Sequence, residues 1–355
     1  SGSCLIVFLG RVRLFFRECM LQSIYLCQLL CWALLMNSPK EGRSLVLLFA
    51  FQGCVCAFNL LEGLGFSSYL ITPAFTLLYG PMIYFFTLSI TGKQPFKTSH
   101  YAVHLIPAAI SLAFTHYTQA IILLGSLSQL GYFYFAYGIL KRYHKQLMHA
   151  RSDAESLKLK WLIKALFIFA IIVVFDLLRM NVQPITPLDL KMHWYLLNEI
   201  LLLLMFSFLL FHTIKNSFQF EPVTLPEEPE AEQTDSADEQ LAQQIFSTID
   251  NLVINESLYR QPRLSLNDLA NQTGLGSKEI SWAINSSTGN NFCEYINQHR
   301  VNDVKREIEQ DSPQKLSLIE LAFQAGFNSK STFNAVFKKE TGLTPSQFKK
   351  QTQKN

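Results

Sequence analysis

Hydrophobic residues are distributed very unevenly along this chain. Up to about Phe218, Leu, Phe, Ile and Tyr dominate, whereas after Pro222 the sequence is polar and charged. The apolar part contains segments of about 20 residues, the length of helix that crosses the hydrocarbon core of a bilayer. They are Cys19–Met36, Ser44–Gly63, Ser67–Ile90, Tyr101–Phe114, Thr118–Leu140, Leu159–Met180 and Trp194–Thr213. The pattern therefore predicts a seven-helix transmembrane domain over residues 18–218, after an N-terminal segment, 1–17, whose origin stays open.

Residues 219–240 have the composition of a linker. They include Pro222, Pro226 and Pro229 and several Asp and Glu residues, but no Lys or Arg. Such a sequence is too polar to bury a core, so we expect a disordered tether. Its negative charge should keep it away from anionic lipid and DNA. The residues that follow, 241–355, return to apolar positions at helical spacing and predict a second, soluble domain.

Within this second domain, residues 317–338 have the pattern of two short helices joined by a tight turn. Small Ala322 lets another helix approach closely, and Gly326 is placed where a helix ends in the left-handed conformation that glycine adopts easily. Ser329 is placed to cap the next helix, on which Phe333 faces inward while polar and basic side chains face outward. An exposed helix of this kind can enter the major groove of DNA.

Residues 264–285 repeat this pattern, with Leu269, Gly274 and Ser277 in the corresponding places. Apolar positions between Phe292 and Gln310 predict a helix that connects the two motifs. The sequence therefore predicts two helix-turn-helix motifs in an all-helical domain.

Further residues give these two motifs a family resemblance. The connecting helix begins Asn291-Phe292, the run Gly-Phe-Asn-Ser-Lys-Ser-Thr-Phe occupies 326–333, and Gly342-x-Thr344-Pro345 closes the domain. Together they resemble the DNA-binding domain of the AraC/XylS family over about Leu241 to Lys350. The resemblance implies control of a nearby promoter, more often activation than repression.

Certain side chains of the two motifs are predicted to contact DNA, the short polar ones selecting bases and the lysines meeting phosphate. In the first motif they are Ser277, Lys278, Glu279, Ser281 and Trp282; in the second they are Ser329, Lys330, Ser331, Thr332 and Asn334, with Lys338 and Lys339 on phosphate. For several of them an alternative stays open. Glu279 could be a solvated surface charge, and Ser277 and Ser329 could serve only as helix caps. Trp282 replaces an Arg frequent in the family, which leaves stacking, a thymine-methyl contact or no base contact open.

The distribution of Lys and Arg predicts how the apolar helices are oriented. The fifth loop is the richest in cations, and the first and third carry some: Lys40, Arg43, Lys93, Lys97, Lys141, Arg142, Lys145, Arg151, Lys158 and Lys160. We therefore expect the odd loops and the C-terminal domain in the cytoplasm and the N-terminus outside, in a bacterial inner (cytoplasmic) membrane. Arg11, Arg13 and Arg17 argue against this orientation, in an atypical segment.

Four charged residues fall on the outward side of the predicted bundle: Glu62, Asp176, Arg179 and Glu199. Charge inside a membrane is costly and suggests function. Our hypothesis is that these groups, with Asn59, Tyr69 and Asn198, line a pocket for a small polar ligand. The alternative is a structural polar network.

The remaining motifs argue against enzymatic chemistry. The sequence has no phosphate-binding loop, no metal-spaced His cluster and no Gly-x-Ser-x-Gly elbow, and six of its seven cysteines lie in apolar stretches. We therefore expect a protein without enzyme activity, metal or cofactor.

Taken together, these patterns predict a membrane-embedded one-component transcription regulator of the all-α class. Its expected partners are duplex DNA at a promoter, membrane lipid, a small extracellular or periplasmic ligand, a second copy of the chain and RNA polymerase. Two alternatives stay open: a transporter or enzyme-like bundle with a regulatory DNA-binding tail, and an inert anchor for a constitutive DNA-binding domain.

Overall fold

The computed structural model describes most of the chain, and its regular structure is helical. The described residues are 40–63, 70–92, 98–182, 185–216, 236–310 and 316–353. Among them no strand occurs, and β pairing is limited to an isolated bridge between Arg151 and Ser265. The predicted all-helical class is therefore confirmed for the described residues.

The chain divides into two compact units. The first comprises Ser1–Lys141 with Leu159–Val223, and the second comprises Arg142–Lys158 with Thr224–Asn355. The sequence pattern places Arg142–Lys158 in a loop of the apolar domain, whereas the structure groups this segment with the C-terminal residues.

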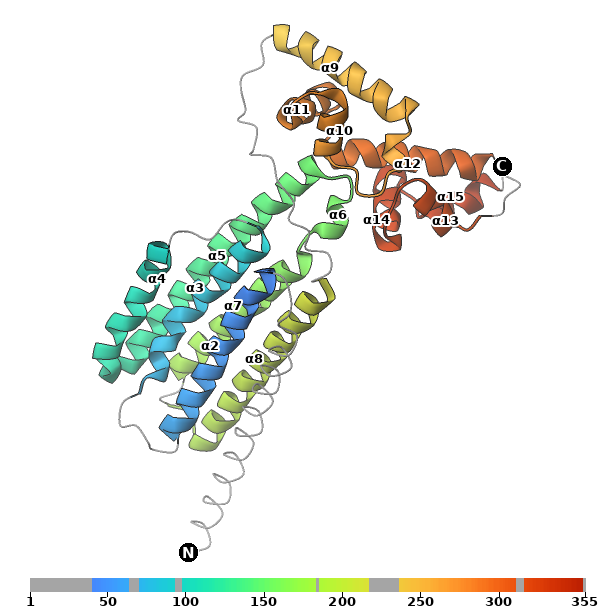
Figure 1. Ribbon diagram of the computed structural model, residues 1–355. Helices are drawn as coiled ribbons and strands as arrows, with labels where there is room; N and C mark the ends of the chain where they lie inside the picture. The colour runs from blue at the N-terminus through green and yellow to red at the C-terminus, as the bar shows by residue number, and fades with distance from the viewer. Residues whose placement is uncertain are drawn as a thin grey trace, which may run out of the picture. The chain divides into compact units, whose positions relative to one another are not determined.

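The first unit is a set of helices that run alongside one another (Figure 1). They are α2 (Lys40–Gly63), α3 (Thr72–Ile90), α4 (Thr98–Ser111), η1 (Leu112–Tyr117), the first part of α5 (Thr118–Ala150), α7 (Lys160–Val182) and α8 (Leu188–Asn216). The second, third, fifth, sixth and seventh predicted spans each coincide with one of these helices, and the fourth, Tyr101–Phe114, covers most of α4 and part of η1. The first span, Cys19–Met36, lies outside the described residues.

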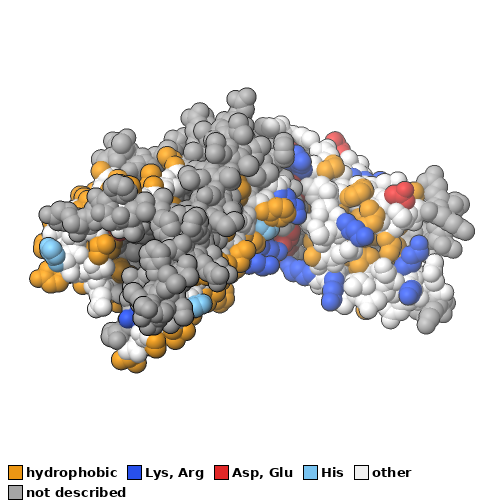
Figure 2. Space-filling view, turned by 90° about the horizontal axis from the view of Figure 1, so that it is seen from below, with side chains coloured by type: hydrophobic (Ala, Val, Ile, Leu, Met, Phe, Trp, Pro, Cys, Tyr) orange, Lys and Arg blue, Asp and Glu red, His pale blue; other side chains and the backbone are white. Residues whose placement is uncertain are grey.

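Length and apolar composition identify three stretches of the described chain that could cross a membrane: Thr72–Ile90, Ala102–Ala150 and Ala154–Arg179. Leu47–Asn59 and Leu196–His212 are apolar but shorter. Large apolar side chains such as Val103, Leu124 and Phe167 are exposed on these helices. In Figure 2 exposed hydrophobic side chains gather over one part of the surface, and Lys and Arg over another.

Small residues bring α3 and α5 close together. A Cβ on Gly80 would lie 2.7 Å from the Tyr132 ring, and one on Gly125 would lie 2.2 Å from the Thr76 hydroxyl. The Gln129 amide donates a hydrogen bond of 2.8 Å to the Thr76 carbonyl. Close packing through small residues, reinforced by hydrogen bonds between helices, is typical of helices in lipid.

The second unit contains two longer helices, α9 and α12, together with several short ones (Figure 1). They are the end of α5, α6 (Ala154–Leu157), α9 (Ser236–Asn255), η4 (Leu258–Arg260), α10 (Leu266–Thr273), α11 (Ser277–Thr288), α12 (Phe292–Glu309), α13 (Leu318–Gln324), α14 (Lys330–Thr341) and α15 (Pro345–Thr352). α9 begins at Ser236, so the last residues of the predicted linker are helical; residues 217–235 lie outside the described part.

Helix α12 joins two hydrophobic clusters. The first contains Ile249, Leu269 and Ile284 together with Phe292 from the start of α12. The second contains Val304 from the later part of α12, with Ala322, Phe333 and Phe337 among its members. Each cluster thus holds one helix pair, α10–α11 or α13–α14, and α12 is the predicted connecting helix.

The turns between paired helices form as the sequence predicts. Ser329 Oγ accepts a hydrogen bond from the Thr332 amide and caps α14. Gly326, after the end of α13, has a φ of 94°. Ser265 and Ser317 start α10 and α13 through reciprocal capping boxes with Asp268 and Glu320.

Candidate nucleic-acid interface and bundle cavity

Helix α11 begins at Ser277, and the preceding Gly276 is its N-cap. Ser277 Oγ donates to Asn267 Oδ1 on α10 at 2.9 Å, which ties the two helices of the motif together. The Glu279 carboxylate accepts a hydrogen bond of 3.4 Å from the Gly276 amide, so this residue helps to cap its own helix. Lys278 and Glu279 are exposed.

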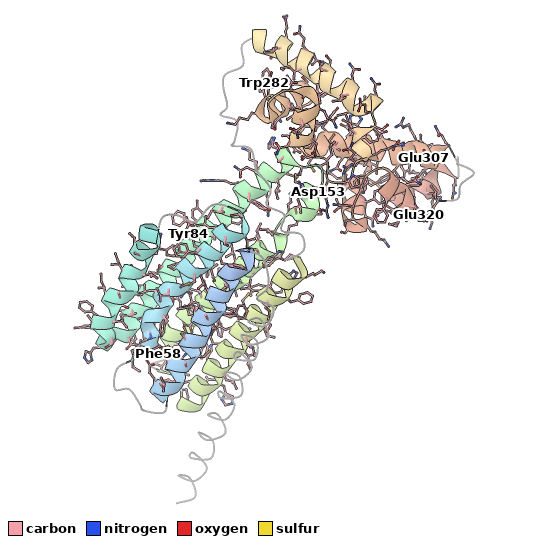
Figure 3. The ribbon with its side chains drawn as sticks, in the orientation of Figure 1. Phe58, Tyr84, Asp153, Trp282, Glu307 and Glu320 are labelled. Atoms are coloured by element: carbon pink, nitrogen blue, oxygen red, sulfur yellow. The ribbon has the colours of Figure 1, made fainter. Side chains whose placement is uncertain are left out.

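Two other residues predicted to contact DNA lie deeper in α11. Trp282, labelled in Figure 3, is half-buried and packs against the first hydrophobic cluster. Ser281 is 6% exposed and its Oγ lies 3.4 Å from His149 Nδ1. Both residues therefore have partners within the protein, and their contact with DNA remains a prediction.

Helix α14 presents a more open polar surface than α11. Lys330, Ser331, Asn334 and Lys338 are exposed, whereas Thr332 is 8% exposed. The Ser329 and Ser331 hydroxyls lie 2.7 Å apart. A basic and polar first turn of this kind has the chemistry of a reading helix, since the N-terminal residues of such helices contact base edges.

Lys339, near the end of α14, is held by an ion pair with Glu294 of α12 at 2.6 Å. The hydrogen bond that Lys339 donates to Glu294 raises the pKa of Lys339. Burial raises the pKa of Glu294, but hydrogen bonds from Lys339 and the Asn291 amide outweigh burial, and the net shift is downward. Lys339 therefore fixes α14 against α12 in addition to its predicted phosphate contact.

Arg300 is the largest fully buried side chain of the second unit, at 1% exposed. Its Nε donates to the Tyr259 carbonyl at 2.6 Å and its Nη2 to the Gln261 carbonyl at 2.9 Å. Its guanidinium also lies over the Phe327 ring, 5.7 Å from the centroid. Arg300 therefore stabilises the junction between the two motifs, a structural role.

No pattern in the sequence predicts the contribution of Arg142–Lys158 to this unit. Its polar composition, with Arg151, Asp153 and Glu155, is that of an ordinary loop between membrane segments. Docking onto another domain leaves no periodic signal in such a short stretch.

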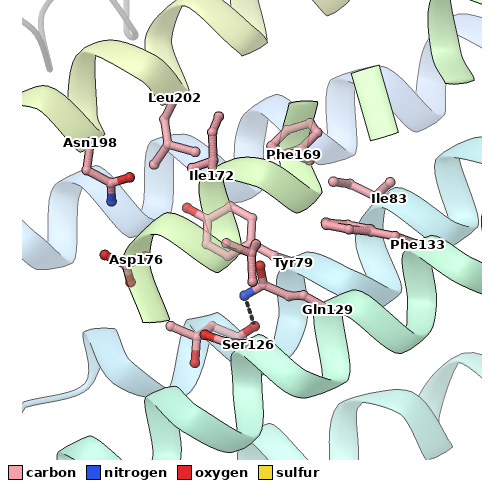
Figure 4. Close-up of a pocket in the computed structure, with 12 residues that line it drawn as sticks. Tyr79, Ile83, Ser126, Gln129, Phe133, Phe169, Ile172, Asp176, Asn198 and Leu202 are labelled. Carbon is pink, nitrogen blue, oxygen red and sulfur yellow. Dashed lines mark hydrogen bonds between the residues drawn. The ribbon is translucent and has the colours of Figure 1, made fainter. Parts of the chain in front are cut away.

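Between the helices of the first unit lies a cavity of about 110 Å³. Asp176, Asn198, Gln129 and Tyr79 contribute polar atoms to its wall, and Phe133 and Phe169 are among the apolar residues (Figure 4). Asn198 Oδ1 is buried and has no hydrogen-bond partner within the described structure. A buried acceptor of this kind is costly unless a ligand or water satisfies it.

The four charged residues of the pocket hypothesis lie in different surroundings. Asp176 lines the cavity and accepts a hydrogen bond of 2.7 Å from Arg179 Nε. Glu62 instead accepts hydrogen bonds from the Ile71 and Thr72 amides and the Thr72 hydroxyl, before and at the start of α3. The Glu199 side chain and Tyr69 lie outside the described part.

The C-terminal region matches known proteins. Residues 269–351 match a family model described as a helix-turn-helix domain. Over 96 residues the chain is 23% identical to "Probable transcription factor PqrA" of Proteus vulgaris, which covers 27% of this chain and 76% of that protein. A solved structure, of a protein of unknown function from Listeria innocua, is 28% identical and covers 29% of this chain and 94% of its own, with a TM-score of 0.26.

The class of the C-terminal unit follows from its paired motifs and from these matches. The chain carries an AraC-type helix-turn-helix domain at its C-terminal end. The presence of this domain supports a role in transcription regulation through binding to DNA. Domains of this type are typically found in regulators and not in enzymes.

Proposed function

We propose that this chain is a membrane-embedded one-component transcription regulator, in which the apolar helices sense a signal and the C-terminal unit binds promoter DNA. The observation that carries the proposal is the presence, on one chain, of an AraC-type domain and of helices long and apolar enough to cross a membrane. Exposed apolar side chains on those helices support it, because a surface of this kind is unfavourable in water and favourable in lipid.

The proposed orientation has the N-terminus outside and the DNA-binding unit in the cytoplasm of a bacterial cell. The excess of Lys and Arg in the loop around Lys141 and Lys158 supports it, since such loops remain on the cytoplasmic side. In this orientation the DNA-binding unit lies in the same compartment as the chromosome.

The cavity of the first unit supplies a site for the signal. Asp176 and Asn198 offer acceptor oxygens, and the Phe133 and Phe169 rings offer apolar surface. These groups fit a small molecule that carries hydrogen-bond donors on a partly apolar body. Such a ligand controls the protein only if it binds one arrangement of helices more tightly than another.

A direct test is to replace the apolar helices by an unrelated membrane anchor of the same orientation. DNA occupied by the intact and the exchanged protein would be mapped across the genome, with and without candidate extracellular solutes. We expect solute-dependent occupancy only with the native helices. Unchanged regulation with the foreign anchor would identify the helices as an inert anchor.

The cavity is tested separately by Asn198→Leu. Asn59→Leu on α2 is the matched control, because Asn59, although part of the pocket hypothesis, does not line this cavity. We expect Asn198→Leu to abolish or shift the solute response while DNA occupancy in the absence of solute is retained. An unchanged response would remove the cavity from the proposal and leave the regulator itself in place.

A further inference from the structure

A segment far from the C-terminal domain in sequence is packed into that domain. Ser152 is 1% exposed, Asp153 3% and Ala154 0%. Residues 149–155, which we call the docked segment, include the end of α5 and the start of α6. They belong to the same compact unit as α9 to α15.

Ser152 is the centre of the docking contact, and each of its polar groups is hydrogen-bonded to the DNA-binding domain. Its amide donates to the Leu264 carbonyl at 2.9 Å. Its carbonyl accepts from Cys293 Sγ and Asn297 Nδ2, each at 3.3 Å. Its hydroxyl accepts from Arg300 Nη2 at 2.9 Å. Three residues on one face of α12 therefore recognise a single serine.

The chemistry of Arg300 favours this docking. Burial lowers the pKa of Arg300 to about 10, and the nearby Asp153 carboxylate opposes that shift. The docked segment thus supplies a neutral acceptor and a negative charge to a guanidinium that is cut off from water. Burial likewise raises the pKa of Cys293 to about 12, so its thiol stays protonated and donates to Ser152.

The docked segment also reaches both reading helices. His149 Nδ1 lies 3.4 Å from the Ser281 hydroxyl on α11. Asp153, labelled in Figure 3, accepts a hydrogen bond of 3.3 Å from Asn328, the residue before the cap of α14. The pKa of Lys339 on α14 is raised mainly by Glu294, and Glu155 adds to the rise. The segment therefore contacts α11 and the turn that leads into α14, and Glu155 acts electrostatically on α14 itself.

We propose that the docked segment and duplex DNA compete for the face of the domain between α11 and α14, so that DNA binds only after the segment leaves. The proposal rests on DNA binding by the two motifs. Reading helices place their first turns in the groove while flanking groups meet the backbone. Atoms of the segment occupy space beside both helices, and the carboxylates of Asp153 and Glu155 would repel phosphate.

The contact has the features of a reversible switch. Its contacts are hydrogen bonds centred on Ser152, and water can replace each of them when the segment leaves. The chain continues from the segment into two apolar stretches, Ala102–Ala150 and Ala154–Arg179. A rearrangement of those helices can therefore pull the segment from the domain, without any role for the linker at residues 219–240.

The first test is Ser152→Phe in the full chain, reconstituted in lipid nanodiscs. A bulky apolar side chain cannot occupy this buried, fully hydrogen-bonded position, so the segment should leave. With a pool of random-sequence duplexes as the probe, we expect the Kd for duplex to fall about tenfold or more. A tenfold fall corresponds to a gain of ~1.4 kcal/mol in binding free energy, because the segment no longer has to be displaced. Gln146→Phe, a half-buried position earlier on α5, is the matched control and should leave Kd unchanged.

The second test locks the segment in place with a covalent link and compares the joined and unjoined forms of the same double variant. Asp153→Cys and Asn328→Cys, together in the full chain, are joined by a short bismaleimide, and the linked peptides are identified by mass spectrometry. We expect joining to weaken duplex binding at least tenfold, and saturating duplex to lower the yield of joining. Treatment with N-ethylmaleimide, which modifies both thiols without joining them, is the control.

The outcomes separate this proposal from the broader function. The competition would be contradicted if the joined and unjoined chains bound duplex with equal affinity and if duplex did not change the yield of joining. DNA binding by the domain would then still stand. Absence of duplex binding in every form, including Ser152→Phe, would overturn both.

Discussion

At the scale of single residues, Gly326 shows two constraints at one position. Its φ of 94° lies in the left-handed region, which the sequence pattern anticipates from its place after a short helix. A Cβ at this position would also lie 2.7 Å from the Tyr259 and Arg260 carbonyl oxygens. These oxygens belong to a different part of the chain, so the second constraint follows from tertiary packing alone.

Gly326→Ala should therefore destabilise the second unit by more than Gly274→Ala. Gly274 also has a positive φ, of 73°, but a Cβ there would have no neighbour within 4 Å. We expect Gly274→Ala to lower the free energy of unfolding by about 1 kcal/mol, the usual cost of alanine in the left-handed conformation. Gly326→Ala should lower it further, because the added Cβ would overlap the two carbonyl oxygens. Hydrogen exchange of α12 and α14 in the full chain would measure both, and equal losses of protection would contradict the close contact.

The ion pair between Glu294 and Lys339 should give the second unit a pH-dependent stability. Because the pKa of Glu294 is lowered on folding, its contribution is present above the unfolded value near 4.3 and is lost as pH falls through the folded value. Glu294→Gln should thus cost under about 1 kcal/mol at pH 7, since the pair is partly exposed and Gln can still cap α12. Denaturation of wild type and variant should differ at pH 7, and the difference should disappear as the pH falls through the folded pKa of Glu294; a constant difference would contradict the pairing.

At the scale of elements, α11 and α14 differ in how much of their surface is available. On α11 the predicted contacts Ser281 and Trp282 are engaged within the protein, by His149 and by the first hydrophobic cluster. On α14 the exposed residues Lys330, Ser331 and Asn334 form an open polar surface. Because more of its polar surface is available, we expect α14 to contribute more than α11 to sequence selection when the unit binds DNA.

Substitutions on α14 should separate phosphate contacts from base contacts. Lys330→Ala should weaken binding to all duplexes and reduce the slope of log K against log salt by about 1, because one fewer cation is released. Asn334→Ala should instead cost about 1–3 kcal/mol at preferred sites and little elsewhere. Titrations at several salt concentrations, with selected and random duplexes, would measure both effects; identical salt slopes for wild type and Lys330→Ala would argue against a phosphate contact.

At the scale of the whole molecule, the central prediction is the side of the membrane that holds the C-terminal unit. Protease added to inside-out vesicles should release fragments of residues 236–353, whereas right-side-out vesicles should protect them. The reason is the excess of Lys and Arg in the loops assigned to the cytoplasm. Release from right-side-out vesicles alone would contradict the orientation and the proposed function with it.

Local patterns in the sequence were sufficient for the helical class, for the helices at six predicted spans and for both helix-turn-helix motifs. Ser329 and Gly326 could be assigned from the sequence because capping and left-handed turns depend on neighbouring residues. The roles of Glu62 and Ser277 could not be assigned in this way. Glu62 binds the amides at the start of the next helix, and Ser277 binds Asn267 on the preceding one.

What the sequence by itself determined is the arrangement of apolar helices followed by a DNA-reading domain, because hydrophobic periodicity and turn chemistry are local properties. Only the tertiary structure decided that Ser152 lies against Arg300, 148 residues away along the chain, and that Asp176 and Asn198 share a cavity. Such contacts depend on the shape and desolvation of surfaces from distant segments, which no local pattern encodes.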